Sequence, residues 1–190
     1  DLDMDQVGIP EEKAWEIYHP LIVRSLGQRG VPKLDAARAV SERSDVARKE
    51  MLKIMGKRPV VVNRAPVLHR YGVMAFWPQL VKNDTMQVSP LIVGGFGADF
   101  DGDAMQYHIP VSSSAVDEAI NKLLPSRNLF SAADFNVHYK PSQEYTGGLY
   151  SASTTKSRKG PRTFSSKAEA IHAYRRGEIN AGQQVTILND

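Results

Sequence analysis

The sequence predicts an α+β fold in which a helical N-terminal segment precedes a small β-structure and short C-terminal helices. Residues 10–55 carry apolar side chains at helical spacing, whereas the chain after Pro59 changes to short runs of β-type residues between Pro, Gly and Asn-Asp turns. Five such runs with irregular linkers favour a small barrel over an alternating βαβ sheet. A chain of 190 residues, 42% hydrophobic and 24% charged, is typical of a globular protein.

The first predicted helix covers residues 10–29. Pro10 suits the first helical position, and Glu11 and Glu12 follow at the positive end of the helix dipole. Pro20 predicts a kink or a split, because proline lacks the N–H that continues the helical hydrogen bonds.

A second helix is predicted from Asp35, as N-cap, to Met55, with Gly56 as C-cap. Its apolar face is narrow and the remaining positions are charged. The two helices together predict a helical hairpin at the N-terminus.

The elements after residue 57 are predicted from shorter patterns, namely capping-box spacings and short β-type runs. A helix is predicted to begin near Ser113 or Ser114, since Ser114 and Asp117 have the spacing of a capping box. Ser166 and Glu169 repeat that spacing before a further helix, and residues 183–188 close the chain as a strand. The five predicted strands lie at residues 60–62, 73–77, 86–88, 91–93 and 105–109.

Composition excludes several classes of site and protein. Cysteine is absent, which excludes disulfide frameworks, thiolate nucleophiles and cysteine-ligated zinc. No apolar run approaches the ~20 residues of a membrane span, and we expect no signal peptide. We therefore expect a reduced, cytoplasmic compartment and no membrane partner. Because the first residue is Asp1 rather than Met, we also expect a piece of a longer protein.

Positive charge is concentrated near the C-terminus. Residues 1–139 hold 16 basic and 17 acidic residues, whereas residues 140–190 hold eight and four. Residues 156–167 combine five Lys and Arg with Ser, Thr, Gly and Pro. Such a stretch is typical either of a segment that follows phosphates or of a solvated loop.

The most informative motif is the run 94–103, GGFGADFDGD, which places Asp99, Asp101 and Asp103 at alternate positions. Three carboxylates this close raise one another's pKa unless a cation neutralises them. A hard divalent ion bound by oxygens removes the conflict, and Mg²⁺ completed by water and substrate phosphate fits best.

The motif allows three other interpretations. A calcium-binding EF-hand loop that began at Asp99 would need Gly and Glu where Ala104 and Pro110 stand. The loop of haloacid-dehalogenase-type phosphatases is similar at Asp99 and Asp101 but carries Thr where this chain has Asp103. A simple acidic turn without a ligand is the third.

The chain resembles the largest catalytic subunit, β′, of multisubunit DNA-dependent RNA polymerases. The run ADFDGD matches the metal-binding motif of that family, NADFDGD, and residues 63–70, NRAPVLHR, resemble its NRAPTLHR. Further elements follow in the same order: Gly8-Ile9-Pro10 before a helix, Pro90-Leu91, and Pro141-Ser142-Gln143. The resemblance is therefore collinear over nearly the whole chain.

The resemblance implies a double-psi β-barrel core, incomplete in this chain, with the three aspartates as metal ligands and catalytic residues. They would hold one Mg²⁺ tightly, while a second Mg²⁺ arrives with the nucleotide. The implied partners are a β-type subunit, the remaining β′ segments, the DNA template, the RNA transcript and nucleoside triphosphates. The implied division is a helical segment at residues 1–57, the catalytic barrel with its metal loop and following helix at 58–145, and a basic α/β segment at 146–190.

The same resemblance assigns three nucleotide-binding residues. Arg64 matches the arginine that reaches the sugar of the nucleotide or RNA end, Pro66 lines the same place, and Gln143 lines the pocket. An alternative for Arg64 is a structural salt bridge within the barrel loops.

One departure from the family concerns Gly97, which stands where the family has an asparagine that helps to recognise the ribose 2′-OH. Glycine has no side-chain donor or acceptor, so sugar discrimination would rest on Arg64 or on another chain. This divergence predicts a phage or mobile-element polymerase, which would act in the host cytoplasm.

Two functions outside polymerisation remain open from the sequence. One is a stand-alone Mg²⁺-dependent phosphatase or nuclease. The other is a non-catalytic nucleic-acid-binding module that uses the basic stretch 156–167.

Overall fold

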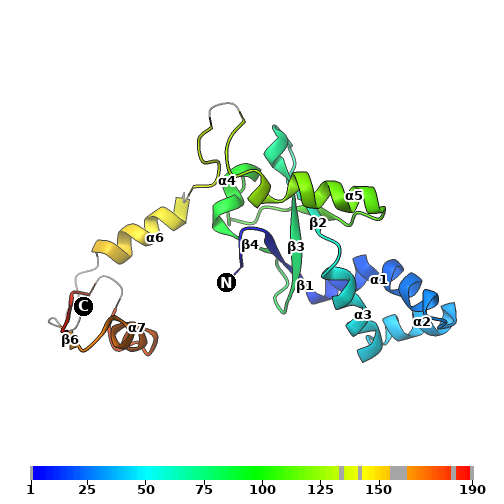
Figure 1. Ribbon diagram of the computed structural model, residues 1–190, viewed down its shortest axis with the longest axis horizontal. Coiled ribbons are helices and arrows are strands. Elements are labelled where there is room, and N and C mark those ends of the chain that lie inside the picture. Colours follow the sequence, from blue (N-terminus) through cyan, green and yellow to red (C-terminus); the bar gives the residue numbers. More distant parts are fainter. Residues whose placement is uncertain (1, 133–134, 141–142, 155–161, 181–182, 189–190) are drawn as a thin grey trace. The chain divides into compact units, whose positions relative to one another are not determined.

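The computed structural model describes residues 2–132, 135–140, 143–154, 162–180 and 183–188 (Figure 1). The chain divides into two compact units, Asp1–Lys140 and Pro141–Asp190. The predicted α+β class is confirmed, because helices accompany a five-stranded mixed sheet in the first unit. The division into three segments stays a prediction.

No helix in the described ranges has both the length and the apolar character needed to cross a bilayer.

The sheet of the first unit has the strand order β4-β1-β3-β2-β5. Strand β1 (Gln6–Pro10) lies between β4 (Gln87–Val88) and β3 (Val73–Val81), antiparallel to the first and parallel to the second. Strand β2 (Val60–Asn63) pairs antiparallel with both β3 and β5 (Gln106–His108). The described strands therefore form an open sheet with edges at β4 and β5, and no closure into a barrel is observed among them.

Strand β1 is absent from the predicted strands, although it lies inside the sheet. It is short, and it contains Gly8 and ends in Pro10, two residue types that weaken a strand signal. Val7 and Ile9 are fully buried. A Cβ at Gly8 would lie 2.8 Å from Val81 Cγ1 and 2.9 Å from Gln87 Cβ, so the close approach of β1 to its neighbours requires glycine.

Three helices, rather than a hairpin, precede β2: α1 (Glu11–Gln28), α2 (Lys33–Ser41) and α3 (Asp45–Met55). The predicted second helix is interrupted because Arg43 adopts a left-handed conformation with φ 50°, and Ser44 caps the new helix with its side chain.

The predicted ends of these helices are partly correct. Gly56 is the C-cap of α3, as predicted, but α2 begins at Lys33 after Pro32, not at Asp35. Helix α1 continues through Pro20 without a split. Pro20 is exposed, so the Glu16 carbonyl that it leaves without a helical partner is on a side where water can bind it.

The core of the first unit lies between these helices and the sheet. Tyr18, Ile22, Met51 and Phe76 are fully buried in one hydrophobic cluster that includes residues of β1, β2 and β3. The only charged side chain among the buried residues described is Glu50, which accepts a hydrogen bond from Ser25 Oγ at 2.6 Å and pairs with Arg29 at 2.9 Å. This network ties α3 to α1.

The predicted strand at residues 91–93 is wrong, because that run is helical. A 3₁₀ turn, η2 (Pro90–Ile92), leads directly into the short helix α4 (Val93–Phe96). A short apolar run does not distinguish a buried strand from a buried helical turn, and Pro90 at the first helical position favours the turn.

The first unit ends with three consecutive helical pieces. They are α5 (Ser113–Glu118), the π-helical turn η3 (Ala119–Leu123) and the 3₁₀ turn η4 (Pro125–Arg127). Ser112 caps α5 by accepting a hydrogen bond from Ala115 N–H at 3.2 Å, so the cap precedes the predicted Ser114.

The second unit contains α6 (Gln143–Thr154), β6 (Arg162–Phe164), α7 (Lys167–Arg175) and β7 (Val185–Ile187). Strands β6 and β7 pair in parallel. The predicted cap at Ser166 and the final strand are confirmed. Lys156, Arg158 and Lys159 of the basic stretch lie outside the described residues.

The tight packing around Gly8 leads to a stability prediction. The substitution Gly8→Ala forces β1 away from β3 or β4 and is expected to lower the free energy of unfolding by about 1–3 kcal/mol. In the matched control Gly27→Ala, the new Cβ meets nothing within 4 Å in helix α1, so stability is expected to rise by up to ~1 kcal/mol. Urea denaturation of both variants followed by circular dichroism tests this, and equal stabilities would contradict the packing argument.

Candidate metal centre

The three aspartates lie on the segment that crosses from one edge of the sheet to the other. Strand β4 forms one edge and β5 the opposite edge, and the chain between them runs through η2, α4 and then the acidic loop at residues 97–105. The buried side chains of Phe96 and Ala98 anchor the start of this loop. The acidic residues are therefore presented on a connection whose two ends are both held by the sheet.

Gly97 reverses the chain at the start of the loop. It has φ 56°, and its N–H donates to the Gly94 carbonyl at 3.3 Å, while Ala98 N–H donates to the Val93 carbonyl at 3.2 Å. These two hydrogen bonds form a Schellman motif, which needs a left-handed residue at its C′ position. Glycine and asparagine are the residues that adopt this conformation most readily.

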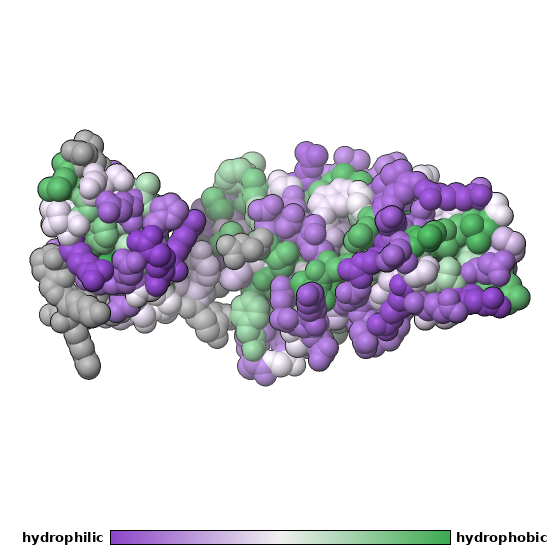
Figure 2. All heavy atoms as spheres, turned by 90° about the horizontal axis from the view of Figure 1, so that it is seen from below, coloured by the Kyte–Doolittle hydropathy of each residue, from purple (hydrophilic) through white to green (hydrophobic). Residues whose placement is uncertain are grey.

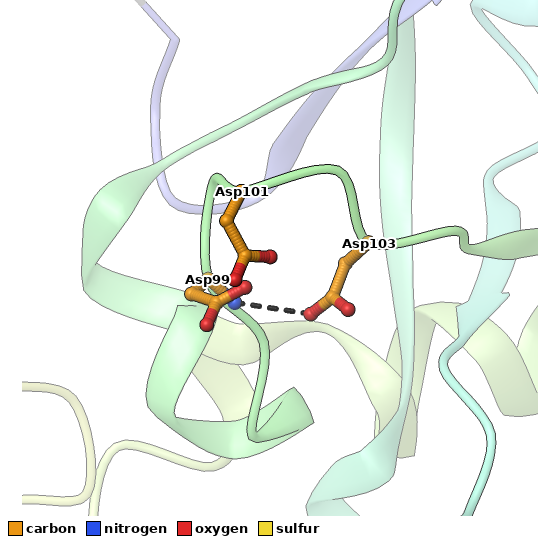
Figure 3. Close-up of side chains that lie close together, drawn as sticks. All are labelled: Asp99, Asp101 and Asp103. Carbon is orange, nitrogen blue, oxygen red and sulfur yellow. Dashed lines mark hydrogen bonds between the residues drawn. The ribbon is translucent and has the colours of Figure 1, made fainter.

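The carboxylates converge inside the loop (Figure 3). Asp99, Asp101 and Asp103 each offer an oxygen within 4.8 Å of those of the other two. The side chains of Asp99 and Asp101 lie next to each other, and Asp103 faces them across the loop. The backbone N–H of Asp99 donates to Asp103 Oδ2 at 3.1 Å and closes the turn, in which Gly102 has φ 115°.

Arg64 holds the third carboxylate from a neighbouring strand. Its Nε lies 2.8 Å from Asp103 Oδ2, and its Nη2 donates to Asp103 Oδ1 at 3.1 Å. Arg64 directly follows β2, which pairs with β5, the strand that the acidic loop enters. The salt bridge considered from the sequence as an alternative for Arg64 is thus present, and it is made to a member of the metal motif.

The electrostatics of the three carboxylates differ. The hydrogen bond from Arg64, followed by that from Asp99 N–H, lowers the pKa of Asp103. A hydrogen bond with Asp101, followed by partial desolvation and the two neighbouring negative charges, raises the pKa of Asp99. Asp103 is therefore held ionised, whereas Asp99 and Asp101 experience a mutual repulsion that a bound cation would relieve.

The donor set fits a hard divalent cation. Ligand oxygens around one Mg²⁺ lie about 3 to 4 Å from one another, so the oxygens of this cluster need only small side-chain rotations to share one ion. The loop is open to solvent, which leaves room for water and substrate oxygens to complete six ligands. Each carboxylate oxygen has two lone pairs, so Asp103 is able to bind a cation while it accepts from Arg64.

A cavity of about 430 Å³ adjoins the loop. Asp99 and Asp103 contribute to its wall together with apolar side chains. Lys13 of α1 and Tyr107 of β5 also line it, and the sequence had no local signal for either, because the fold alone brings these distant residues to the loop. The apolar lining residues include Met86, Val88, Val93, Phe96 and Met105.

The nucleotide-binding roles of Pro66 and Gln143 stay predictions. Pro66 is exposed, two residues beyond Arg64. Gln143 is the first residue of α6 in the second unit, and its side chain is outside what the structure describes. Of the predicted site residues, the structure therefore brings together Asp99, Asp101, Asp103 and Arg64.

Comparison of the sequence with known protein families indicates the class of protein to which this fold and site correspond. Residues 31–124, which run from the loop after α1 through the acidic loop to the residue after η3, match the family described as RNA polymerase Rpb1, domain 2. This match includes both Arg64 and the three aspartates.

The particular subunit follows from relatives that match the chain over nearly its full length. The DNA-directed RNA polymerase subunit beta′ of Tropheryma whipplei is 43% identical over 191 residues, covering 98% of this chain and 15% of the relative. The beta′ subunits of Bacteroides fragilis (ATCC 25285) and Chloroherpeton thalassium are 38% and 36% identical, covering 99% and 100% of this chain and 14% and 13% of the relatives. The chain is therefore homologous to one segment of the RNA polymerase β′ subunit.

These comparisons bear on how much of the β′ subunit the chain represents and on its expected phage origin. The chain spans about 15% or less of the length of the relatives it matches. The relatives named above are bacterial proteins and do not support the expected phage or mobile-element origin.

The left-handed turn at Gly97 leads to a second stability prediction. Gly97→Asn is expected to retain stability within ~1 kcal/mol, because asparagine tolerates φ 56° and a Cβ there meets nothing within 4 Å. Gly97→Val is expected to lose about 1–2 kcal/mol more than Asn, since a β-branched residue is strained in this conformation. Thermal or urea denaturation measures both.

The matched control for that strain is Gly94→Val, at an exposed glycine that also has open space around its Cβ but no positive φ. If Gly97→Val and Gly94→Val lose equal stability, the conformation at Gly97 is not the cause.

Proposed function

We propose that this chain forms the metal-bearing part of the active centre of a DNA-dependent RNA polymerase, which performs template-directed nucleotidyl transfer only when assembled with a β-type subunit. The observation that carries the proposal is the convergence of Asp99, Asp101 and Asp103 in one solvent-accessible loop of a β′ homologue. The paired Arg64 beside them supports the same interpretation.

The three aspartates are proposed as the ligands of one tightly held Mg²⁺, with a second arriving on the nucleotide. Two such ions would stabilise the attacking RNA 3′-oxygen and the leaving pyrophosphate of an in-line displacement. The chain's own contribution is to hold its carboxylates in place: Asp103 is fixed by Arg64 and by the Asp99 N–H, and the turn at Gly97 fixes where the loop begins.

The nucleotide contacts are proposals on the same basis. Arg64 contacts Asp103 through Nε and Nη2, which leaves other N–H donors of its guanidinium for a sugar hydroxyl next to the metal loop. Pro66 is proposed to line the same place and Gln143 the nucleotide pocket. Because Gly97 carries no side chain, recognition of the ribose 2′-OH is proposed to depend on Arg64 or on another chain.

Assembly with further chain segments is supported by the open sheet and by exposed apolar residues. Strand edges left unpaired at β4 and β5 need a cover, and the remaining strands of a double-psi barrel would supply it. On the face shown in Figure 2, hydrophobic residues lie among hydrophilic ones. Leu68, Phe100 and Val111 are 84%, 59% and 59% exposed. We propose a β-type subunit, the other β′ segments, DNA, RNA and nucleoside triphosphates as partners in the cytoplasm.

The direct test is RNA extension by the assembled enzyme. Asp101→Ala removes one ligand and is expected to lower Mg²⁺-dependent extension of a template-bound primer by roughly a hundredfold or more, as the loss of a transition-state charge contact does. Asp117→Ala, at an exposed position of α5, removes the same charge outside the site and is expected to retain full activity.

Full activity of the Asp101→Ala enzyme would overturn the proposal. Mg²⁺-dependent hydrolysis of a phosphate ester by the isolated chain would instead favour the phosphatase or nuclease. Salt-sensitive DNA binding that survives loss of all three aspartates, without extension, would favour the non-catalytic module.

A further inference from the structure

A second cavity, of about 350 Å³, lies in the first unit away from the acidic loop. It is enclosed by η1 (Arg70–Gly72), the start of β3, and the turns η3 and η4. No residue of the acidic loop lines it. Among the residues that the structure describes, nine line the cavity; Arg70, Lys122 and Arg127 are cationic, and none of the nine is acidic.

Arg70 is held in a fixed position at this cavity. Its Nη2 donates to Asn128 Oδ1 at 2.8 Å, and the Asn128 amide in turn donates to the carbonyls of Lys122 at 2.8 Å and Leu124 at 3.1 Å. The guanidinium also lies 5.1 Å from the centre of the Tyr71 ring. Toward the described part of the chain, Arg70 thus donates one of its five N–H groups, to Asn128, which leaves the other four for paired oxygens of a ligand.

The other two cationic side chains, Lys122 and Arg127, are able to bind an anion with little loss of existing interactions. The Arg127 side chain has no hydrogen-bond or ion-pair partner among the residues that the structure describes. Lys122 pairs with Glu118 at 3.0 Å, but both side chains are mostly exposed, and such surface pairs contribute little to stability. An anion in the cavity would therefore meet three cationic side chains without displacing a buried ion pair.

We propose that this cavity binds a phosphate group. Three cationic lining residues suit an anion with several charged oxygens, and two of them are arginines, whose planar donors match phosphate oxygens in pairs. Tyr71 also lines the cavity, but its ring is already engaged by Arg70 and by His138, whose ring centre is 3.7 Å away. The site offers charge rather than a surface for stacking a base, which favours recognition of phosphate without sequence preference.

This proposal does not depend on the metal centre. The phosphate group has two sources with the same chemistry, a free phosphate ion or the backbone of a nucleic acid, and the cavity is larger than one phosphate. The test on the full chain therefore uses two probes: inorganic phosphate, followed by amide chemical shifts in NMR, and a fluorescein-labelled oligothymidylate, followed by fluorescence anisotropy.

Inorganic phosphate is expected to shift amide signals of residues 70–74 and 121–128. Arg127→Gln is expected to weaken its binding about tenfold, and Lys122→Gln to weaken it in the same direction. Arg38→Gln, which removes the same charge from an exposed site on α2, is expected to leave binding unchanged. Unaltered melting of the exposed-residue variants shows that the fold is retained.

The oligothymidylate distinguishes the two sources. If the site takes a nucleic-acid backbone, the oligonucleotide competes with phosphate, and Arg127→Gln lowers the slope of log affinity against log salt by about 0.7. Phosphate binding without competition assigns the site to the free ion. Either result supports the cavity as a phosphate site. Absence of phosphate shifts at residues 70–74 and 121–128, or equal effects of Arg127→Gln and Arg38→Gln, would overturn it.

Discussion

Mutual repulsion of three carboxylates is the constraint on which the arrangement of the candidate site depends. Asp99, Asp101 and Asp103 place oxygens within 4.8 Å of one another, a distance at which like charges repel. Without a cation, the protein limits this repulsion through two partners of Asp103. Arg64 neutralises Asp103 through an ion-pair contact from Nε and a hydrogen bond from Nη2, and the Asp99 N–H donates a further hydrogen bond. The repulsion that remains, between Asp99 and Asp101, is what a divalent ion would relieve.

Strand pairing in the sheet brings Arg64 to the acidic loop, which the loop sequence alone does not provide. Arg64 and Asp103 are 39 residues apart in sequence, and they meet because β2 pairs with β5. The acidic loop reaches β5 from the opposite edge of the same sheet, through the buried residues of α4. Strand β1 is packed inside that sheet, where Gly8 permits close approach to its neighbours. The position of the carboxylates is therefore a consequence of strand pairing and not only of the local motif.

What was predictable from the sequence was mostly local. The three aspartates lie within a run of five residues, so the local sequence was enough to predict that they converge in a turn. The cap at Ser166 and the strands β2 and β3 were also predictable from local patterns. Strand β1 was missed because its stability comes from partners far along the chain, and the helical turn at 91–93 was missed because a three-residue apolar run suits either structure. The break at Arg43, the Arg64–Asp103 pair and the basic cavity around Arg70 all depend on tertiary contacts or conformations that no local pattern signals.

The central claim is that the loop at residues 97–105 binds a divalent cation through its three carboxylates. Substoichiometric Mn²⁺ added to the isotope-labelled chain, with amide signals followed by NMR, tests it most directly, because a bound paramagnetic ion broadens only nearby signals. The account predicts selective broadening of signals from residues 97–105 and of Arg64, reversed by excess Mg²⁺ and absent when all three aspartates are replaced by asparagine. Uniform broadening across the surface, or the same selective pattern in the triple variant, would contradict it.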